Sequence, residues 1–329
     1  MADYKYDVTA LGELLIDFTE NGTSRQGNPI YEANPGGAPC NVLSMLRNLG
    51  HDVAFIGKVG DDIFGRQLKA AVEDVGIDTT GLVTDDDVRT TLAFVKTFED
   101  GDRDFSFYRN PGADMMLNPD DVNEDVIRGA RIFHMGTLSM THEPVRSATC
   151  KAVAVAQSVQ AMISFDPNIR EPLWDDMEDA KEQTAFGLSV CDILKISDNE
   201  IQWFTGEQDF DAGIKKIQDE YNIPLILLSL GKVGSRAYLK NNVTDVKAEV
   251  PAFVREDTVE TTGAGDTFGG CCLHYVLEHC PEGTDINDVD WTEENLKEML
   301  TFANKAASII TTRKGALAVM PTLEEINAQ

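Results

Sequence analysis

Positive charge is scarce in this chain. Its 329 residues include 28 lysines and arginines against 56 aspartates and glutamates, which gives a formal net charge of -28. We find no local cluster of basic residues in the sequence. Nucleic acids and anionic membrane surfaces attract proteins through such clusters, so the composition argues against both as partners. We interpret the acidity as a property of the whole surface that favours solubility.

The sequence also lacks a long apolar run at its start and a paired-cysteine motif. The first 18 residues contain the acidic Asp3 and no uninterrupted apolar core, so we expect neither a signal peptide nor a membrane span there. The six cysteines show no Cys-x-x-Cys pair and no metal-like spacing with histidine; they are Cys40, Cys150, Cys191, Cys271, Cys272 and Cys280. We expect buried, reduced thiols and a cytoplasmic location.

The stretch ETTGAGDTFGGCC, which begins at Glu260, is rich in glycine but matches neither common phosphate-binding motif. A P-loop has Lys-Ser or Lys-Thr after the second glycine, and a dinucleotide fingerprint has a third glycine where Phe268 stands. The residues after Asp266 are typical of a helix, so the turn presents backbone N–H groups at a helix N-terminus, where anions bind. Asp266 is then either a helix cap or a carboxylate that accepts the proton of an alcohol during phosphoryl transfer.

Short apolar runs alternate with helical patterns over most of the chain. Strand-like runs cover residues 53–59, 131–136, 161–166, 191–197 and 224–231, and helical patterns cover 39–50, 62–76, 143–160, 174–189 and 214–221. Buried runs joined by helices indicate an α/β fold with a mostly parallel sheet that is covered on both faces. In such sheets, ligands bind beyond the carboxyl ends of the strands.

Two stretches break this alternation, residues 13–35 and 90–109. The second alternates with period two around the turn EDGD, a pattern that is typical of a hairpin. We interpret the two stretches together as a small β-sheet that lies beside the main core of a single domain.

Polar or glycine-rich turns follow three consecutive strand-like runs, which places them where an α/β enzyme builds its site. They comprise Asp166, Asn168 and Arg170; Lys195, Ser197 and Glu200; and Ser229, Gly231 and Gly234. A diglycine, Gly36-Gly37, precedes the helix that starts near Pro39. It is either a plain tight turn or a place where a polyhydroxy ligand reaches the backbone, with Asn41 offering both a donor and an acceptor.

Two further groups have two interpretations each. Asp17 ends an apolar run, so it is either a buried carboxylate that needs polar partners, such as sugar hydroxyls, or an exposed residue of the small sheet. Arg109 and Asp114 bracket a turn with Pro111 and Gly112, and form either a surface salt bridge or part of a ligand site.

These segments together resemble the ribokinase-like, or PfkB, family of sugar kinases, and within it the fructokinases. The resemblance runs nearly from end to end. The stretch NPGGAPCNVLSMLRNLG from Asn34, followed by FIGKVGDDIFG, is similar to the N-terminal signature of the family, and ETTGAGDTFGG is similar to its C-terminal signature. The segments GELLIDF, FYRNPGADMML, ISFDPNIREPLW and LKISDNEIQWFTG resemble those of fructokinases, and related sugar kinases share them in part.

The resemblance implies a three-layer α/β/α sandwich with a mostly parallel central sheet and a small β-sheet lid, formed by about residues 13–36 and 88–112. It also implies a homodimer that pairs through the lid, ATP and Mg²⁺ as cofactors, and a small-molecule sugar as substrate. Asp266 would be the general base, and Gly263, Ala264 and Gly265 would form an anion hole. The residues around the sugar would be Asp17, Gly36, Gly37, Asn41, Arg109 and Asp114.

The resemblance also assigns the nucleotide side. Asn168 and Glu200 would lie near the phosphates and a metal-bound water, with Lys195 in the ATP site and Arg170 in the phosphate region. Ser229, Gly231 and Gly234 would bind the nucleotide, and Asn304 would flank the adenine.

Two positions depart from the family pattern. Serine replaces asparagine at the start of the Asn-x-x-Glu element, which is here Ser197-Asp198-Asn199-Glu200. Glu260 stands where an aspartate often precedes the two threonines, and that aspartate helps to hold a monovalent cation in some members. A K⁺ site would involve Glu260 and Thr262, and the longer carboxylate either shifts or abolishes it.

The function predicted from this resemblance is transfer of phosphate from ATP to D-fructose, which gives fructose 6-phosphate and ADP. The alternatives in the same family are a 2-keto-3-deoxygluconate kinase, a ribokinase, and a nucleoside kinase that stacks its substrate on Phe105 and Phe107. A nicotinamide-dependent dehydrogenase is disfavoured because the glycine fingerprint is missing. A nucleotide-binding module without catalysis is disfavoured because Asp266 and its glycines are intact.

Overall fold

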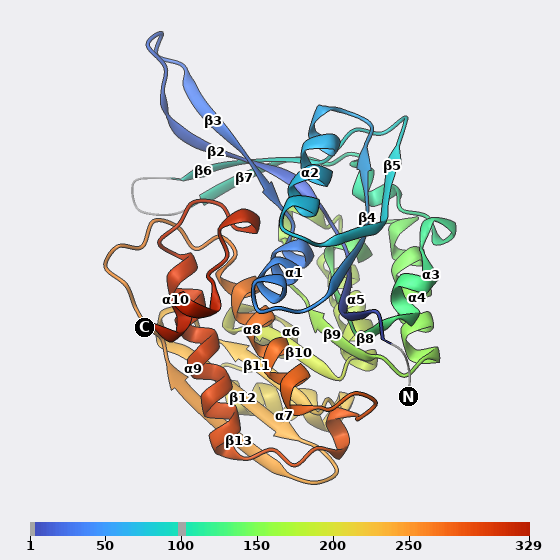
Figure 1. The fold of residues 1–329 in the computed structure, drawn as a ribbon, viewed down its shortest axis with the longest axis vertical. Helices are drawn as coiled ribbons and strands as arrows, with labels where there is room; N and C mark the ends of the chain where they lie inside the picture. The colour runs from blue at the N-terminus through green and yellow to red at the C-terminus, as the bar shows by residue number, and fades with distance from the viewer. Residues whose placement is uncertain (1–3, 98–102) are drawn as a thin grey trace.

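A large twisted sheet forms the centre of the computed structural model, which describes residues 4–97 and 103–329 (Figure 1). Among these residues, nine strands join in the order β13-β12-β11-β10-β9-β8-β1-β4-β5. The strands are β1 (Tyr6–Leu11), β4 (Val53–Gly60), β5 (Asp78–Asp85), β8 (Ala130–Gly136), β9 (Met162–Asp166), β10 (Ile193–Ser197), β11 (Leu225–Ser229), β12 (Gly234–Lys240) and β13 (Asp245–Pro251). Neighbours from β5 to β11 are parallel, and β12 and β13 are antiparallel. The predicted mostly parallel sheet is therefore confirmed.

Helices cover both faces of this sheet, because successive strand residues point to opposite sides. In β4, Val53 and Phe55 belong to one apolar core, and Ala54 and Ile56 belong to the other. The first core contains α1 (Ala38–Asn48), α2 (Ile63–Asp74), α8 (Ala264–His279), α9 (Glu293–Ile310) and α10 (Leu323–Asn327). The second contains α3 (Glu124–Arg128), α4 (Val145–Ser158), α5 (Met177–Val190), α6 (Asp198–Thr205) and α7 (Phe210–Tyr221). The three-layer arrangement that the sequence predicts is thus present.

A second, four-stranded sheet projects from the main body (Figure 1). Its strands follow the order β3 (Pro29–Gly36), β2 (Leu15–Thr23), β6 (Leu92–Thr97) and β7 (Arg103–Tyr108). β2 and β6 are parallel, whereas β2–β3 and β6–β7 are antiparallel. The two predicted β stretches therefore do form one small sheet, and the predicted hairpin is β6–β7. Its EDGD turn, residues 99–102, lies outside the described residues.

The helices α1 and α8 pack closely against each other at Gly270. A Cβ atom added at Gly270 would lie 2.9 Å from Cβ of Met45 and 3.1 Å from the carbonyl oxygen of Val42. Because residues four apart share one face of a helix, Asp266, Gly270 and His274 all lie on this side of α8. The small residue at the centre therefore brings the two helix backbones together.

The predicted helices are present with small shifts at their ends. Gly50 and Gly76, which follow α1 and α2, have φ values of 93° and 83°, as residues that end helices often do. The helix predicted from residue 214 begins earlier, at Phe210, because Asp209 caps it by accepting a hydrogen bond from the Ala212 N–H. All six cysteines are free thiols, and Cys150 alone among them is only partly buried. In the described part of the chain, no helix is both long and apolar enough to cross a membrane.

Candidate active site

A cavity of about 280 Å³ lies between the large sheet, the start of α8 and the small sheet. It is at the carboxyl edge of the large sheet, near β1 and β8, where the strand order reverses; this is the usual ligand site of open α/β sheets. The predicted site residues in its lining are Asp17, Gly36, Gly37, Asn41, Asn168, Arg170, Lys195, Glu260, Thr262, Gly263, Gly265 and Asp266. Segments that are far apart in the sequence therefore converge as the motifs predict.

Asp266 lies in the first turn of α8 and does not cap it. The N-cap position is Gly263, with φ 74°, and no side chain accepts a hydrogen bond there. The Asp266 carboxylate instead accepts a 2.8 Å hydrogen bond from the side-chain amide of Asn41. The interpretation of Asp266 as a cap is therefore wrong. Burial raises the pKa of Asp266, while Asn41, Lys195 and Arg170 partly oppose this shift.

The start of α8 offers the backbone of an anion site next to a positive charge. The first N–H groups of a helix have no partner within it, so those of Gly265 and Asp266 are available to a ligand. A Cβ atom at Gly265 would lie 3.3 Å from Nζ of Lys195, so the ammonium is adjacent to this turn. Ala264 differs from its neighbours, because its N–H donates to the carbonyl of Thr261 at 3.2 Å and it does not line the cavity.

Lys195 is itself held by a carboxylate at the end of β9. Its Nζ lies 2.9 Å from Asp166, and this pair is buried. Burial raises the pKa of Asp166 to about 6 despite Lys195. Sequence reasoning noted Asp166 only as a strand end and did not predict the pair, because nothing in the spacing of the two residues encodes it.

Glu200 does not line the cavity, but it supports a loop that does. One carboxylate oxygen accepts from the Ile169 N–H at 2.8 Å, and the other accepts from the N–H and hydroxyl of Ser197 at 2.9 and 2.7 Å. Burial acts to raise the pKa of Glu200, but Lys195 and these hydrogen bonds outweigh it, so the pKa lies below the ordinary value. Ser197 therefore still orients Glu200, although it replaces the asparagine of the family pattern.

The loop after β9 brings two further predicted residues to the cavity. Asn168 has φ 44°, a left-handed conformation that non-glycine residues rarely adopt and that often marks a functional segment. Arg170 is exposed and donates to the carbonyl of Ile169 at 3.2 Å. In the described residues it has no carboxylate partner within salt-bridge distance, so its charge is available to an anion.

The small sheet contributes Asp17 to the opposite wall. Asp17 lies on β2 of the small sheet, where its side chain is partly buried and faces the cavity. Burial raises the pKa of Asp17 to about 7, with Arg170 opposing the shift and Glu260 and Asp266 adding to it. A Cβ atom at Gly36 would lie 2.3 Å from a carboxylate oxygen of Asp17, so only glycine leaves room for this carboxylate.

Gly37 and Glu13 hold the start of α1 beside the cavity. Gly37 has φ 132°, and a Cβ atom there would lie 2.4 Å from the carbonyl oxygen of Glu13. The Glu13 carboxylate accepts from the Ala38 N–H at 2.8 Å, and burial raises the pKa of Glu13 to about 7. Sequence reasoning missed Glu13, although an acidic residue directly after the first strand was a visible signal. The diglycine is therefore more than a plain turn, because it lets the chain pass close to Glu13.

Arg109 and Asp114 form an ion pair that is buried, so its interpretation as a surface salt bridge is wrong. The Arg109 Nε lies 2.7 Å from Asp114, and both side chains are 2% exposed. The guanidinium also donates to the Thr141 hydroxyl at 3.1 Å and to the carbonyl of Leu138, which lines the cavity, at 2.8 Å. Neither Arg109 nor Asp114 lines the cavity, so direct contact with a ligand stays a prediction.

Glu260 and Thr262 do line the cavity. The Glu260 carboxylate accepts from the Gly315 N–H at 2.8 Å, which ties the segment before α8 to the loop after α9. One carboxylate oxygen is thereby occupied by a backbone N–H. Glu260 and Thr262 therefore place a carboxylate and a hydroxyl close to the glycine-rich turn at the start of α8.

Four of the residues predicted for the ATP site lie outside the cavity lining, in the region of β11 to β13; they are Ser229, Gly231, Gly234 and Asn304. Ser229 ends β11, and the turn that follows uses Gly231 and Gly234 with φ values of 53° and 134°. Asn304 on α9 is buried; its oxygen accepts from the Ser235 hydroxyl at 2.9 Å, and its amide donates to the carbonyls of Val250 and Pro251 at 3.2 Å each. Its observed contacts fasten α9 to β12 and β13.

Comparisons with known proteins agree with this architecture. A family model described as pfkB family carbohydrate kinase matches residues 5–323. "Probable fructokinase-2" of Arabidopsis thaliana is 42% identical over 322 residues, which cover 97% of this chain and 94% of that protein.

Solved structures extend the likeness to three dimensions. A fructokinase of Xylella fastidiosa with bound ATP has a TM-score of 0.88 at 30% identity, over 98% of this chain and 97% of that one. A double mutant of the fructokinase of Vibrio cholerae, in a form with fructose, ADP and potassium, has a TM-score of 0.82 at 27% identity, over 100% and 99% of the chains. With its sheet order, its small second sheet and the cavity between them, this chain belongs to the pfkB family of carbohydrate kinases and is a phosphotransferase similar to fructokinases.

Proposed function

We propose that this sugar kinase transfers the γ-phosphoryl group of ATP to the 6-hydroxyl of D-fructose. The observation that carries the proposal is the position of Asp266, which Asn41 holds at the start of α8, inside a cavity that the small sheet also lines. The fructokinases that resemble this chain over nearly its whole length support fructose as the acceptor.

The residues divide the reaction into two tasks. Asp266 accepts the proton of the sugar hydroxyl while the hydroxyl oxygen bonds to the γ-phosphorus of ATP. The bond from that phosphorus to the bridging oxygen breaks, and ADP leaves with the electron pair. The N–H groups at the start of α8, with Gly263 and Gly265 as the small residues of the turn, stabilise the charge on the transferred group. Asp17 and Asn41 orient the sugar, and Arg109 and Asp114 shape its side of the cavity from behind Leu138.

Cations accompany the nucleotide in this proposal. Mg²⁺ bound with ATP supplies neutralisation of the phosphate charge. Glu200 suits contact with it through water, because its low pKa keeps it ionised while both its oxygens already accept hydrogen bonds. Asn168, Lys195 and Arg170 would face the phosphates, and Ser229, Gly231, Gly234 and Asn304 the nucleoside. Glu260 and Thr262 would hold K⁺.

We also propose that residues 13–36 and 88–112 act as a lid and pair with the lid of a second copy. The small sheet carries a cluster of aromatic rings: the centroid of Phe94 lies 4.8 Å from that of Phe18, on which it stacks, and 5.5 Å and 5.3 Å from those of Tyr31 and Tyr108, which it meets edge-on. Tyr31 and Tyr108 are 40% and 66% exposed, which is typical of a surface that a partner covers. Analytical ultracentrifugation tests this, and a monomer at micromolar concentration would contradict it. A cytoplasmic location stays a prediction.

The experiment that tests the function is an ADP-release assay with ATP over a panel of D-fructose, D-ribose, 2-keto-3-deoxygluconate and nucleosides. We expect the highest kcat/KM with fructose. Nucleosides are included because Phe107, one of the two rings on which a nucleoside could stack, lines the cavity. The side chain of the other, Phe105, lies outside those that the structure describes. A higher kcat/KM with another acceptor would show that this acceptor, and not fructose, is the substrate. No ADP release with any acceptor would overturn the proposed kinase activity itself. The Asp266→Asn protein, purified in parallel, excludes a contaminating kinase.

A further inference from the structure

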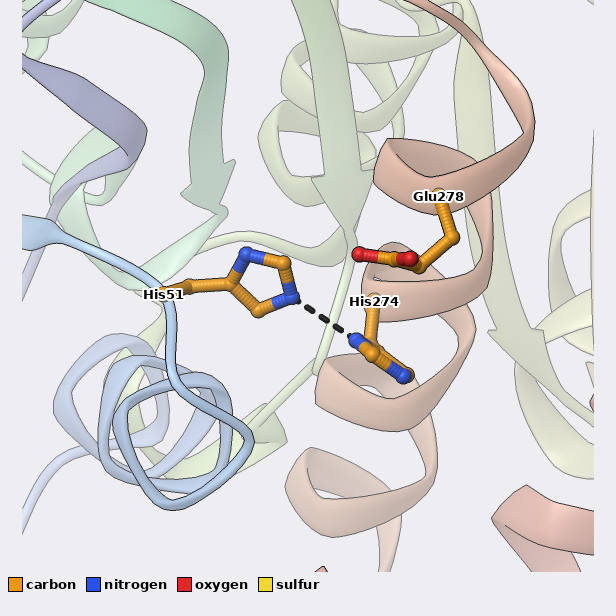
Figure 2. A group of neighbouring side chains, drawn as sticks. All are labelled: His51, His274 and Glu278. Carbon is orange, nitrogen blue, oxygen red and sulfur yellow. Dashed lines mark hydrogen bonds between the residues drawn. The ribbon is translucent and has the colours of Figure 1, made fainter.

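Three potential metal ligands converge far from the start of α8. His51 lies in the turn between α1 and β4, and His274 and Glu278 lie on α8 (Figure 2). One ring nitrogen of each histidine and one carboxylate oxygen of Glu278 all lie within 4.8 Å of one another. The Nε2 of His51 is 2.8 Å from the Nδ1 of His274. In the described part of the chain, this is the one group of three such residues close enough to share an ion.

The fold directs these three side chains toward one another. His274 and Glu278 are four residues apart on one helix, so they emerge from the same face of α8. Figure 2 shows the Glu278 carboxylate on the side of α8 that faces His51. His51 is buried, His274 is partly buried and Glu278 is exposed. The cluster therefore opens to solvent at Glu278, where an ion can enter.

A carboxylate behind His51 fixes the direction of its ring. The Nδ1 of His51 lies 3.1 Å from Asp7, whose other oxygen lies 3.2 Å from a guanidinium nitrogen of Arg131. When Nδ1–H donates to Asp7, the lone pair of Nε2 points to His274 and Glu278. Histidines that bind metals are commonly oriented by a carboxylate or carbonyl in this way.

We propose that His51, His274 and Glu278 form a binding site for a transition-metal ion of the Zn²⁺ class, separate from the Mg²⁺ that accompanies ATP. Two imidazoles and one carboxylate are a ligand set that suits zinc, whereas Mg²⁺ and Ca²⁺ prefer oxygen alone. Zinc–nitrogen bonds of about 2.0–2.1 Å place two nitrogens about 3.3 Å apart in a tetrahedron. The two rings, now 2.8 Å apart, would separate by about half an ångström, and water would complete the coordination.

The competing explanation is a plain hydrogen bond between two histidines. The nearby His279 does not compete for the ion, because its Nδ1–H donates to the Tyr275 carbonyl, 2.9 Å away, and its ring stacks on Trp291. The two explanations differ in one measurable respect, since only the metal site needs Glu278.

The site would also fasten two elements that meet in the cavity. α1 carries Asn41 and α8 carries Asp266, while His51 follows α1 and His274 lies eight residues after Asp266. At about 1.5 Å per residue, the proposed ion is about 12 Å along α8 from the carboxylate. An ion that binds only the folded chain would stabilise this helix pair by mass action.

The experiment is a zinc titration of the full-length, tag-free protein after removal of metals with a chelator. Competition with a chromophoric chelator measures the affinity, and Co²⁺ absorption reports the ligand types. We expect one equivalent of Zn²⁺, a Co²⁺ spectrum of nitrogen and oxygen ligands without thiolate bands, and a rise in Tm with Zn²⁺. His274→Gln should abolish site binding, and Glu278→Gln should weaken it about 10-fold or more. Asp7→Asn, behind the ligands, should weaken it about 10- to 100-fold.

His142→Gln is the matched control, because His142 also faces a carboxylate, that of Asp175 at 3.3 Å, but lies outside the cluster. It should bind zinc like the unmodified protein. If His274→Gln impairs folding, as circular dichroism would reveal, the exposed Glu278→Gln still decides the question. The proposal is overturned by less than half an equivalent of bound Zn²⁺, by thiolate bands with Co²⁺, or by equal affinity in Glu278→Gln and the control.

Discussion

The two walls of the cavity differ in how their polar groups are held. On the large-sheet wall, Asp266 is bonded to Asn41, and Lys195 is paired with Asp166. On the small-sheet wall, the carboxylate of Asp17 has no hydrogen-bond partner among the described residues, and burial raises its pKa to about 7. The first wall is organised before a ligand arrives, which is what stabilisation of a transition state requires. On the second wall, the Asp17 carboxylate is left to hydrogen-bond with a ligand, which is what recognition of a polyol requires.

The largest expected effect is on the organised wall. Asp266→Asn keeps a side chain of the same size that still accepts a hydrogen bond from Asn41, but it cannot accept a proton. We expect kcat to fall about 10²- to 10⁴-fold, the usual contribution of a general base, with small changes in both KM values. Steady-state kinetics with fructose and ATP check this. A kcat within tenfold of the unmodified protein would show that Asp266 is not the base.

A second test breaks the buried ion pair of the same wall. Lys195→Met leaves Asp166 buried without its cation, and removal of one partner of a buried pair costs about 3–5 kcal/mol. We expect the free energy of unfolding at pH 8 to fall by about this amount, as measured by denaturant titration. The loss should shrink as the pH falls from 8 towards 6, because without Lys195 the pKa of the buried Asp166 carboxyl rises above its value of about 6 and the group takes up a proton. The double variant Lys195→Met with Asp166→Asn should recover part of it, and no recovery would contradict the pairing.

A smaller effect is expected on the open wall. Asp17→Ala removes a carboxylate that we propose to bind sugar hydroxyls, and a hydrogen bond to a charged group contributes about 1.5–3 kcal/mol. We expect KM for fructose to rise about 10- to 100-fold, with a much smaller change in KM for ATP. Glu20→Ala, an exposed position on the same strand β2, is the control. A change confined to the KM for ATP would place Asp17 on the wrong side of the reaction.

The smallest effect is a pH dependence without ligand. The folded-state pKa of Asp17 lies above its ordinary value, so the stability that its carboxyl contributes is complete below about pH 4 and is lost as the pH rises through about 7. The Asp17→Asn protein has no carboxyl group at this position, so it does not lose this stability as the pH rises. We therefore expect its Tm, relative to the unmodified protein, to increase from pH 4 to pH 8. Asp86→Asn, at an exposed position, should show no such trend. A constant difference across this range would contradict the raised pKa.

The elements themselves could be predicted from the sequence because their signals are local. Buried runs and glycine stops marked β4, β8 to β11, α1 and α2, and the motifs around Asn41 and Asp266 brought together two residues 225 positions apart. Their roles in the reaction stay predictions, as do the lid and the dimer.

What the sequence did not predict is side-chain pairing across elements. The burial of Arg109 with Asp114, the pair of Lys195 with Asp166, and the contact of His51 with His274 all depend on how strands and helices stack. No spacing along the chain encodes that stacking. The cysteine and histidine spacing gave no metal motif for the same reason, because His51 lies 223 positions from His274.

The close approach of α8 to α1 at Gly270 has a consequence for how the enzyme works. A methyl group at Gly270 would press on Met45 and Val42, so the two helices are in close contact there, and we expect Asp266 to move together with α1. If Asp266 is the base, we then expect movement of the small sheet to bring the acceptor to it. Labels that report distance, placed on the small sheet and on α9, would show motion between the sheets, whereas labels on α1 and α8 would show none.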